Sequence, residues 1–278
     1  MKKIITTFLA VILTAGVFIA QFQASQNVKA ELISEVESIK PGEKFWIALK
    51  LDMAPEWHTY WRNPGDAGFP TQINWSLPEN FSVSEIYWPY PEIFEAGGVV
   101  SYGYKHEILL LSEVTSHADL SGENVKIEAE VSWLECKGMC LPGSAELSLN
   151  LPVNNHQPEY DKRWTDGFDK ARNMLPVNNY DWTFKSTHTD SSIIIESFTS
   201  NGNFPVPEKV QFLPYDEGIY NNSKPQVFKN TDKGFNIEAM FADFKVGDPE
   251  LISGLLKFEN SGGNSTQTVE IAVPIETN

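Results

Sequence analysis

Alternation of apolar and polar residues at period two dominates the chain and limits its fold more than any other feature. In residues 126–133 (KIEAEVSW), Ile127 and Val131 fall on the same face as the final tryptophan, and residues 146–153 (ELSLNLPV) alternate in the same way. The same pattern recurs in residues 45–51, 108–114, 193–198, 236–241 and 269–273. Pro-Gly, Asn-Gly and Gly-Gly turns separate many of these segments. Short alternating strands between such turns are typical of antiparallel sandwiches, so the sequence predicts an all-β protein.

One segment departs from this pattern and predicts a helix. Residues 158–175 (PEYDKRWTDGFDKARNML) open with Pro-Glu, which suits a first helical turn. Trp164, Phe168, Ala171 and Leu175 then recur at helical spacing. We interpret this segment as a helix that joins two β domains.

The two halves of the chain on either side of this helix look alike. Residues 126–133 and 145–153 in the first half match residues 250–258 and 267–275 in the second. A repeat ordered along the chain predicts two sandwiches of one design. We therefore expect a first β-sandwich at 31–153, a helical linker at 154–177 and a second β-sandwich, without cysteines, at 178–278.

The first thirty residues predict a secretory signal peptide. A Lys-Lys start precedes an apolar run at 8–20, and residues 28–30 (VKA) have the small-x-small pattern of a cleavage site. The run is shorter than the ~18 residues that a membrane span needs, with an uncleaved anchor as the alternative. We expect a mature protein that is soluble in a bacterial periplasm. The formal net charge of −16 argues against a nucleic-acid partner, because a phosphate backbone needs a basic face.

The two cysteines of the chain flank a predicted hairpin tip. Cys136 and Cys140 lie between two alternating strands, with Lys137, Gly138 and Met139 between them. Cross-strand neighbours at a hairpin neck approach to ~4.5–5.5 Å, close to the Cα separation that a disulfide requires. An exported chain meets an oxidising compartment, so we expect the pair to be bonded.

This bond has more than one possible role. Closing so short a loop stabilises a fold by only ~2 kcal/mol on the chain-entropy model, and the matching hairpin of the second half has residues 261–264 (SGGN) instead. A redox site therefore competes evenly with a structural staple. A third interpretation uses Cys136, Met139 and Cys140 as soft ligands for Cu(I) after reduction. The histidines offer no metal-ligand spacing, so we expect no other metal site and no cofactor.

Two aromatic blocks accompany the cysteines. Residues 57–68 (WHTYWRNPGDAG) form either a half-buried strand with His58 and Arg62 in solvent, or an aromatic platform that brings His58 or Tyr60 near the sulfurs. Residues 88–104 run from WPYPEIF to YGY and predict a Pro- and Gly-rich loop. That loop either packs between the sheets or forms a movable cover over the disulfide.

These blocks, followed in order by WLECKGMCLPG, resemble the N-terminal periplasmic domain of the disulfide reductase DsbD. The variant is the one found in ScsB-type proteins linked to copper tolerance. The specific motifs lie within residues 31–153, and the resemblance extends loosely through the second half. It implies immunoglobulin-like sandwiches and makes Cys136 and Cys140 the exchanging thiols.

The resemblance also implies roles for neighbouring side chains. Phe94 and Tyr104 would be cap residues that shield the sulfurs. His58 and Tyr60 would flank the pair. Independently of the resemblance, a leaving thiolate needs a lowered pKa or a proton donor, and Lys137 in the loop and His58 on the platform are the candidates.

The function implied is a thiol–disulfide exchange module that relays electrons between a membrane-embedded disulfide reductase on another chain and periplasmic thioredoxin-fold proteins. Family roles of this kind include cytochrome c biogenesis, and an enzymatic role as a protein-disulfide reductase stays open. The sequence departs from the family in having no electron-conducting membrane segment and no C-terminal C-x-x-C. We expect a monomer. The alternatives are a non-catalytic tandem sandwich that binds a protein or glycan, and the Cu(I)-binding protein.

Overall fold

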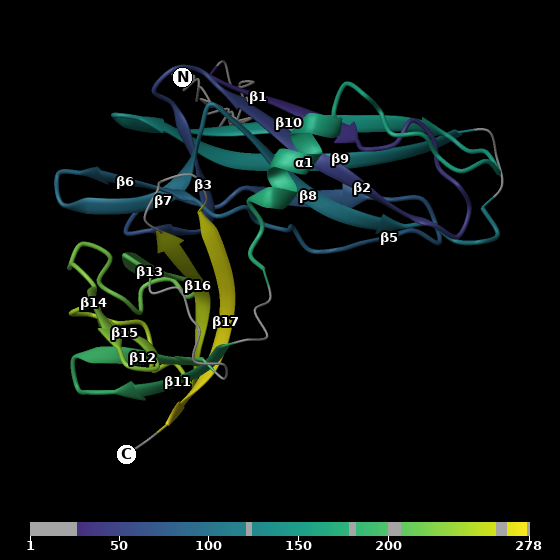
Figure 1. Ribbon diagram of the computed structural model, residues 1–278. Coiled ribbons are helices and arrows are strands. Elements are labelled where there is room, and N and C mark those ends of the chain that lie inside the picture. The colour runs from purple at the N-terminus through teal and green to yellow at the C-terminus, as the bar shows by residue number, and fades with distance from the viewer. Residues whose placement is uncertain (1–26, 121–123, 178–181, 200–206, 260–265, 277–278) are drawn as a thin grey trace, which may run out of the picture.

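The computed structural model describes residues 27–120, 124–177, 182–199, 207–259 and 266–276, which form two β-sandwiches and one helix (Figure 1). The prediction of an all-β protein with two tandem sandwiches is confirmed. The strands of the first sandwich are β1 (Val28–Ser34), β2 (Lys44–Met53), β3 (His58–Gly65), β4 (Gln72–Ser76), β5 (Ser82–Val83), β6 (Glu92–Ala96), β7 (Val99–Lys105), β8 (Glu107–Thr115), β9 (Asn124–Lys137) and β10 (Met139–Pro152). After the helix α1 (Thr165–Asn173) come β11 (Trp182–His188), β12 (Ser192–Thr199), β13 (Lys209–Pro214), β14 (Val227–Thr231), β15 (Gly234–Met240), β16 (Leu251–Glu259) and β17 (Gln267–Glu276).

The first sandwich stacks two sheets over one core. One sheet has the order β1-β2-β8-β5, and the other has the order β10-β9-β3-β7-β6, with β4 paired to β9. Alternate residues of β9, including Ile127, Val131 and Trp133, are buried, while Glu128 and Glu130 are exposed. This strand therefore follows the period-two pattern of its sequence, and the inward residues of both sheets share one apolar cluster.

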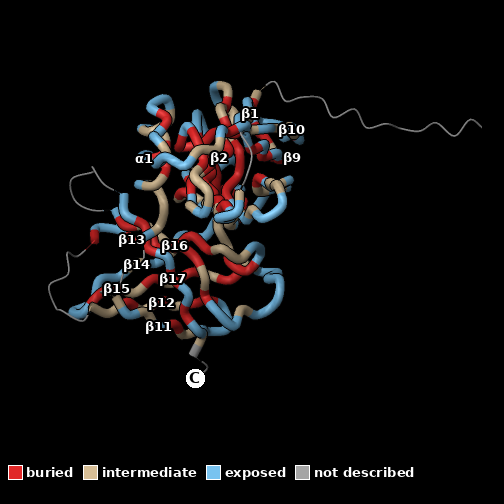
Figure 2. Tube along the Cα trace, turned by 90° about the vertical axis from the view of Figure 1, so that its right-hand side faces the viewer, coloured by how far each residue is buried: buried red, intermediate tan, exposed pale blue. Residues whose placement is uncertain are grey.

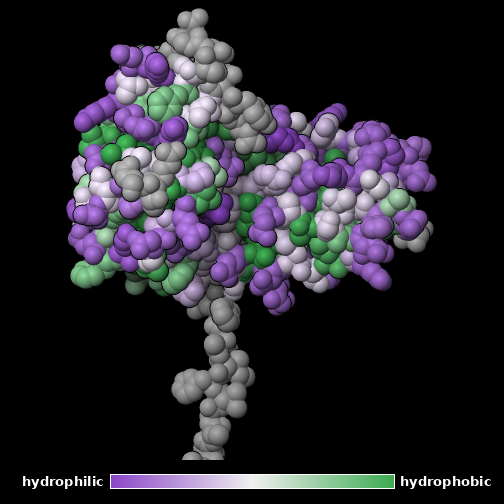
Figure 3. Space-filling view, turned by 90° about the horizontal axis from the view of Figure 1, so that it is seen from below, coloured by the Kyte–Doolittle hydropathy of each residue, from purple (hydrophilic) through white to green (hydrophobic). Residues whose placement is uncertain are grey.

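The second sandwich is one continuous ladder in the order β13-β16-β17-β11-β12-β15-β14. Strand β17 belongs to both layers, because it pairs antiparallel with β16 and parallel with β11. Each sandwich has a buried interior (Figure 2), and Leu213 and Leu255 of the second sandwich pack into the apolar cluster of the first. Hydrophilic side chains are spread between apolar ones over the face seen in Figure 3. Strand β4 pairs antiparallel with β9, and β13 pairs antiparallel with β16. The two halves therefore share this strand pairing, as the predicted repeat would require. Residues 261–264 lie outside the described residues.

Helix α1 is shorter than the predicted helix at 158–175. The residues before it make sheet-type hydrogen bonds instead of helical ones. Glu37 donates its backbone N–H to Glu159, Asp161 donates to Glu35, and Val36 and Tyr160 form a β-bridge. Helical periodicity identified the element. Residues 159–161 pair with the chain after β1, however, so the helix begins only at Thr165.

The helix covers the outer face of the β1-β2-β8 sheet (Figure 1). Phe168 is fully buried there, and Ala171 is buried beside it. They pack against Ile33, Ala48 and Leu111. The predicted linker is thus packed on the first sandwich. No helix in the described ranges is long and apolar enough to cross a membrane.

The fold begins earlier than the predicted boundary at residue 30. Residues 1–26 lie outside the described residues, but Val28 is buried in β1 and pairs with Met53. The Asn27 amide donates to Glu135 Oε1 at 2.8 Å. In β1, Val28 is buried and Lys29 is exposed, as in an alternating strand. The same three residues, 28–30, also match the small-x-small pattern of a cleavage site. The structure therefore includes residues 27–30 in the first sandwich, ahead of the predicted boundary, and the signal peptide itself stays a prediction.

The packing of α1 predicts that Phe168→Ala destabilises the first sandwich. Emptying a fully buried phenylalanine site costs ~3–5 kcal/mol in the free energy of unfolding. Urea unfolding followed by tryptophan fluorescence measures this cost. Lys170→Ala, at an exposed position of the same helix, is the control and should change it little. Equal, small effects of both changes would make α1 a mere connector.

Candidate functional site

The hairpin β9–β10 places the two cysteines directly opposite each other. Cys136 pairs with Cys140 in the ladder, their Cα atoms are 4.2 Å apart, and a disulfide joins them. Gly138 forms the tip with φ at +71°, in the left-handed region that glycine enters without a steric cost. The local sequence thus closes the loop tightly enough to bring both sulfurs together.

The two sulfurs differ in their surroundings because their strands occupy different places in the sheet. Strand β10 is the last strand of its sheet, whereas β9 is covered on its other side by β3, where His58 pairs with Cys136. Cys136 is only 3% exposed, and Cys140 is exposed. Cys140 is therefore the more exposed of the two cysteines.

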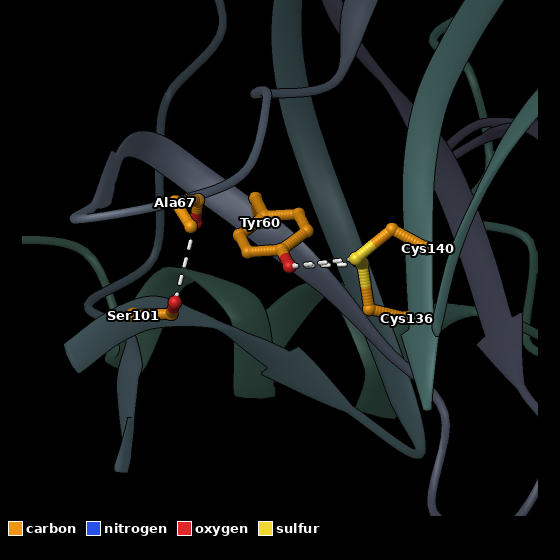
Figure 4. Close-up of a disulfide and its surroundings, with 5 residues drawn as sticks. All are labelled: Tyr60, Ala67, Ser101, Cys136 and Cys140. Atoms are coloured by element: carbon orange, nitrogen blue, oxygen red, sulfur yellow. Dashed lines mark hydrogen bonds between the residues drawn. A yellow bond between two sulfur atoms is a disulfide. The ribbon is translucent and has the colours of Figure 1, made fainter. Parts of the chain in front are cut away.

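A tyrosine hydroxyl points at the disulfide from β3 (Figure 4). Tyr60 donates a hydrogen bond to Cys136 Sγ at 2.9 Å, and its hydroxyl lies 3.7 Å from Cys140 Sγ. Burial raises the pKa of the Tyr60 phenol above its ordinary value, so the hydroxyl keeps its proton. The site therefore contains a fixed hydrogen-bond donor for a sulfur.

The turn after β3 explains a glycine in the first aromatic block. Gly68 has φ at +126°, and a Cβ built on it would lie 2.3 Å from the Tyr60 ring. Only glycine fits against that ring, which is thereby held in position beneath the turn.

The imidazole of His58 continues the aromatic layer. Its ring lies edge-on to Tyr60 at 5.3 Å between centroids and stacks on Phe94 at 4.7 Å. Burial lowers the pKa of His58 below its ordinary value, so the ring is neutral at pH 7. The sequence-predicted platform is present, but His58 adds no positive charge to it.

Phe94 lies on a hairpin and not on the predicted loop. Strands β6 and β7 pair across a tip at Gly97 and Gly98, both with positive φ, and residues 92–105 are called the cap hairpin below. Phe94 is half-buried, with the Lys105 ammonium 6.0 Å from its ring centroid. Two adjacent glycines adopt the positive φ angles that the tight turn needs, so the residues on both sides of the turn can pair as strands.

Tyr104, the other predicted cap residue, is part of the core. It is 3% exposed, and its hydroxyl donates to the backbone oxygen of Pro89 at 2.6 Å. Burial holds the pKa of its phenol well above the ordinary range. Buried at this position, Tyr104 supports the cap hairpin from the interior of the sandwich and cannot act as a movable cover.

Lys137 at the hairpin tip is engaged elsewhere. Its ammonium lies 2.5 Å from Glu56 Oε2, and this contact lowers the pKa of the Glu56 carboxyl. The ion pair is largely exposed, so salt screens it strongly. The Lys137 ammonium is thus paired with the Glu56 carboxylate, on the turn before β3.

A buried carboxylate next to Cys136 was missed from the sequence. Glu135 is 1% exposed and accepts hydrogen bonds from Asn27 Nδ2 at 2.8 Å and from Trp133 Nε1 at 3.1 Å. The signal was available, because Glu135 shares the inward parity of Trp133 in β9. Gly143, opposite Trp133, leaves room for the indole, since a Cβ there would lie 2.4 Å from the ring.

The Cu(I) interpretation would need a reduced site. In the structure both cysteine sulfurs are bonded to each other, and Met139 is 64% exposed beside them. Within the described part of the chain, no three His, Cys, Asp or Glu side chains gather as metal ligands.

Solved structures resemble this chain to very different degrees. Among solved structures, the N-terminal periplasmic domain of ScsB from Proteus mirabilis is similar with a TM-score of 0.62 and 20% identity, over 90% of this chain and 94% of that one. A protein of unknown function from Porphyromonas gingivalis W83 gives a TM-score of 0.27 at 8% identity, over 89% and 99%. The titin Ig tandem domains A164-A165 give 0.19 at 12% identity, over 90% and 99%.

Sequence comparison finds a family model that matches the first sandwich. No curated protein matches the sequence. The family model described as "Thiol:disulfide interchange protein DsbD, N-terminal" matches residues 25–152, which include both cysteines and the β-strands β1 to β10. It also starts before the predicted boundary at residue 30, in agreement with the early start of β1. Residues 25–152 of this chain are therefore a DsbD N-terminal-like domain.

Proposed function

We propose that this chain is a periplasmic thiol–disulfide exchange module that relays two electrons at a time through Cys136 and Cys140. Electrons come from a membrane-embedded disulfide reductase on another polypeptide and pass to thioredoxin-fold proteins. The family match supports exchange chemistry, and the likeness to a periplasmic ScsB domain supports the location.

The unequal exposure of the two sulfurs is the observation that carries this proposal. Exchange needs one sulfur that a partner can reach and a second that resolves the intermediate. Cys140 is exposed at the sheet edge, while Cys136 is buried beside Tyr60. Met139, 64% exposed, and Leu141, 38% exposed, flank Cys140 and offer an apolar rim on which a protein partner can dock.

Reduction begins at the exposed sulfur. A thiolate of the reductase attacks Cys140 Sγ, the bond to Cys136 breaks, and Cys136 leaves as a thiolate. The second cysteine thiolate of the reductase then attacks the reductase sulfur of this mixed disulfide, and Cys140 leaves as a thiolate. The reductase becomes a disulfide, and this chain gains two electrons and, from solvent, two protons.

Delivery reverses the roles. The Cys140 thiolate attacks a disulfide of the oxidised thioredoxin-fold partner and forms a mixed disulfide, with one partner thiolate leaving. Cys136 then attacks Cys140 Sγ, reforms the internal disulfide and releases the second partner thiolate. The partner is reduced by two electrons, and the site returns to its starting state.

Tyr60 is the group that the structure aims at the leaving sulfur. A hydrogen bond donated to a thiolate favours the charged form and so helps Cys136 to leave. The sequence pointed to Lys137 and His58 for this task. Lys137 is paired with Glu56, and His58 is neutral, so the phenol takes the role.

The reduction potential tests this function against the structural staple. Structural disulfides of secreted proteins have potentials below about −300 mV, whereas exchanging ones lie higher. We expect the Cys136–Cys140 couple to lie above that value. Equilibration with glutathione or dithiothreitol buffers, read by thiol alkylation and mass, measures it. A potential below about −300 mV would sink the exchange function and leave a staple.

The cap hairpin generates a second prediction. Phe94 stacks on His58, next to the strand position of Cys136, so its removal should uncover the disulfide. Phe94→Ala should therefore speed reduction by dithiothreitol several-fold, because attack depends on access to the sulfur. The free energy of unfolding should fall by less than the ~3–5 kcal/mol of an emptied core phenylalanine site.

Stopped-flow fluorescence of Trp133, three residues from Cys136, follows this reduction. Phe244→Ala is the control, since Phe244 is 96% exposed in the second sandwich. An unaltered rate in folded Phe94→Ala protein would remove the cap role of Phe94.

A further inference from the structure

Much of the first aromatic block faces the second sandwich and not the disulfide. Asn63, 1% exposed, donates through Nδ2 to the backbone oxygens of Pro214 at 2.9 Å and Asp216 at 3.2 Å. The Trp61 ring lies 5.6 Å from the Tyr215 ring. These contacts bring the strand that carries Tyr60 of the disulfide site against the end of β13.

A second group of contacts joins the loop between β13 and β14 to the cap hairpin. Asn222 Nδ2 donates to Asp66 Oδ1 at 2.9 Å, and Asn222 Oδ1 accepts from the Tyr102 hydroxyl at 3.0 Å. The Ser223 hydroxyl donates to the backbone oxygen of Gly98 at 2.7 Å and lies 3.1 Å from Asp66 Oδ2. Asn222 and Ser223, with these three partners, are called the interdomain clamp.

The turn at residues 65–68, which contains Asp66, also bonds to the cap hairpin within the first sandwich. Asp66 exchanges two hydrogen bonds with Val100, one at 2.8 Å through its own N–H and one at 2.9 Å through its carboxylate. Ser101 donates to the backbone oxygen of Ala67 at 3.2 Å (Figure 4). A continuous set of hydrogen bonds therefore runs from the second sandwich through the 65–68 turn to the cap hairpin.

Little else restrains the outer end of that hairpin. Strand β6 is the last strand of its sheet, and Glu95 and Ala96 are exposed. A Cβ built on Gly97 or Gly98 would meet nothing within 4 Å. The clamp holds the tip at Gly98, four residues from Phe94, where the hairpin has few contacts of its own.

We propose that the second sandwich holds the cap hairpin closed through the interdomain clamp, so that undocking at Asn222 and Ser223 opens the disulfide to attack. The inference rests on the proposed function only in taking the disulfide as the group that is guarded. It assigns positioning roles to Asp66, Asn222 and Ser223, which would act on the disulfide through the cap hairpin. It also gives the second sandwich, which has no cysteine, a task in the exchange reaction.

The test compares Asn222→Ala combined with Ser223→Ala in the full chain with Asn230→Ala, an exposed position on β14 away from the clamp. Two readouts are taken: the rate of disulfide reduction by dithiothreitol, and amide hydrogen exchange of residues 92–105. Losing a hydrogen bond raises an open population about fivefold, so the double variant should be reduced about fivefold faster or more. Exchange should rise in the cap hairpin and stay unchanged in β12.

A second variant guards against a general loss of structure. Asn222→Asp sets a carboxylate against that of exposed Asp66, so it should also speed reduction. The part of the gain that comes from repulsion should disappear in 1 M NaCl, where the screening length is about 3 Å. The part that comes from the lost Nδ2 hydrogen bond should remain. Urea unfolding of each variant confirms that the protein is folded under the conditions of the rate measurement.

Wild-type rates in both clamp variants would overturn the inference, and so would faster exchange of the cap hairpin without faster reduction. An increase equal to that of Asn230→Ala would overturn it as well. These outcomes are separate from the proposed function, because dithiothreitol attacks any disulfide that becomes accessible, whether it is structural or redox-active. A potential below about −300 mV would count against the function and leave the clamp result as it stands.

Discussion

The pairing of β9 with β10 is the constraint on which the site depends. Fourteen cross-strand pairs fix the register, and one of them sets Cys136 opposite Cys140. A slip of one residue would separate the sulfurs and turn Trp133 out of the core. Because β10 ends its sheet and β9 lies inside it, one ladder produces a buried sulfur and an exposed one. The asymmetry that exchange needs is therefore a property of strand order.

The surroundings of the disulfide build on this asymmetry. Strand β3 meets β9 at the buried sulfur, where Tyr60 supplies a donor and His58 a neutral ring that stacks on Phe94. Gly68 fits the turn against the Tyr60 ring. In the proposed mechanism, the polar contact of Tyr60 therefore lies on the leaving sulfur, and exposed apolar side chains flank the attacked one.

The sequence predicted the fold class and the cysteine hairpin because both depend on local pattern. Period-two alternation identified strands such as β9, and the spacing of the cysteines identified a hairpin tip. The start of α1 and of β1 could not be read in this way, since pairing of Tyr160 with Val36 and of Val28 with Met53 decides them. The clamp residues were missed for the same reason. Asp66 lies in a turn motif whose partners, Asn222 and Ser223, are distant in the sequence.

The central claim is that Cys140 is the sulfur through which partners exchange electrons. Cys136→Ser leaves only the exposed thiol, and Cys140→Ser leaves only the buried one. Each variant is incubated with a disulfide-bonded thioredoxin-fold protein, and mixed disulfides are counted by non-reducing electrophoresis and mass spectrometry. The account predicts that a mixed disulfide accumulates with Cys136→Ser and hardly at all with Cys140→Ser. Equal trapping by both variants, or trapping by Cys140→Ser alone, would contradict it.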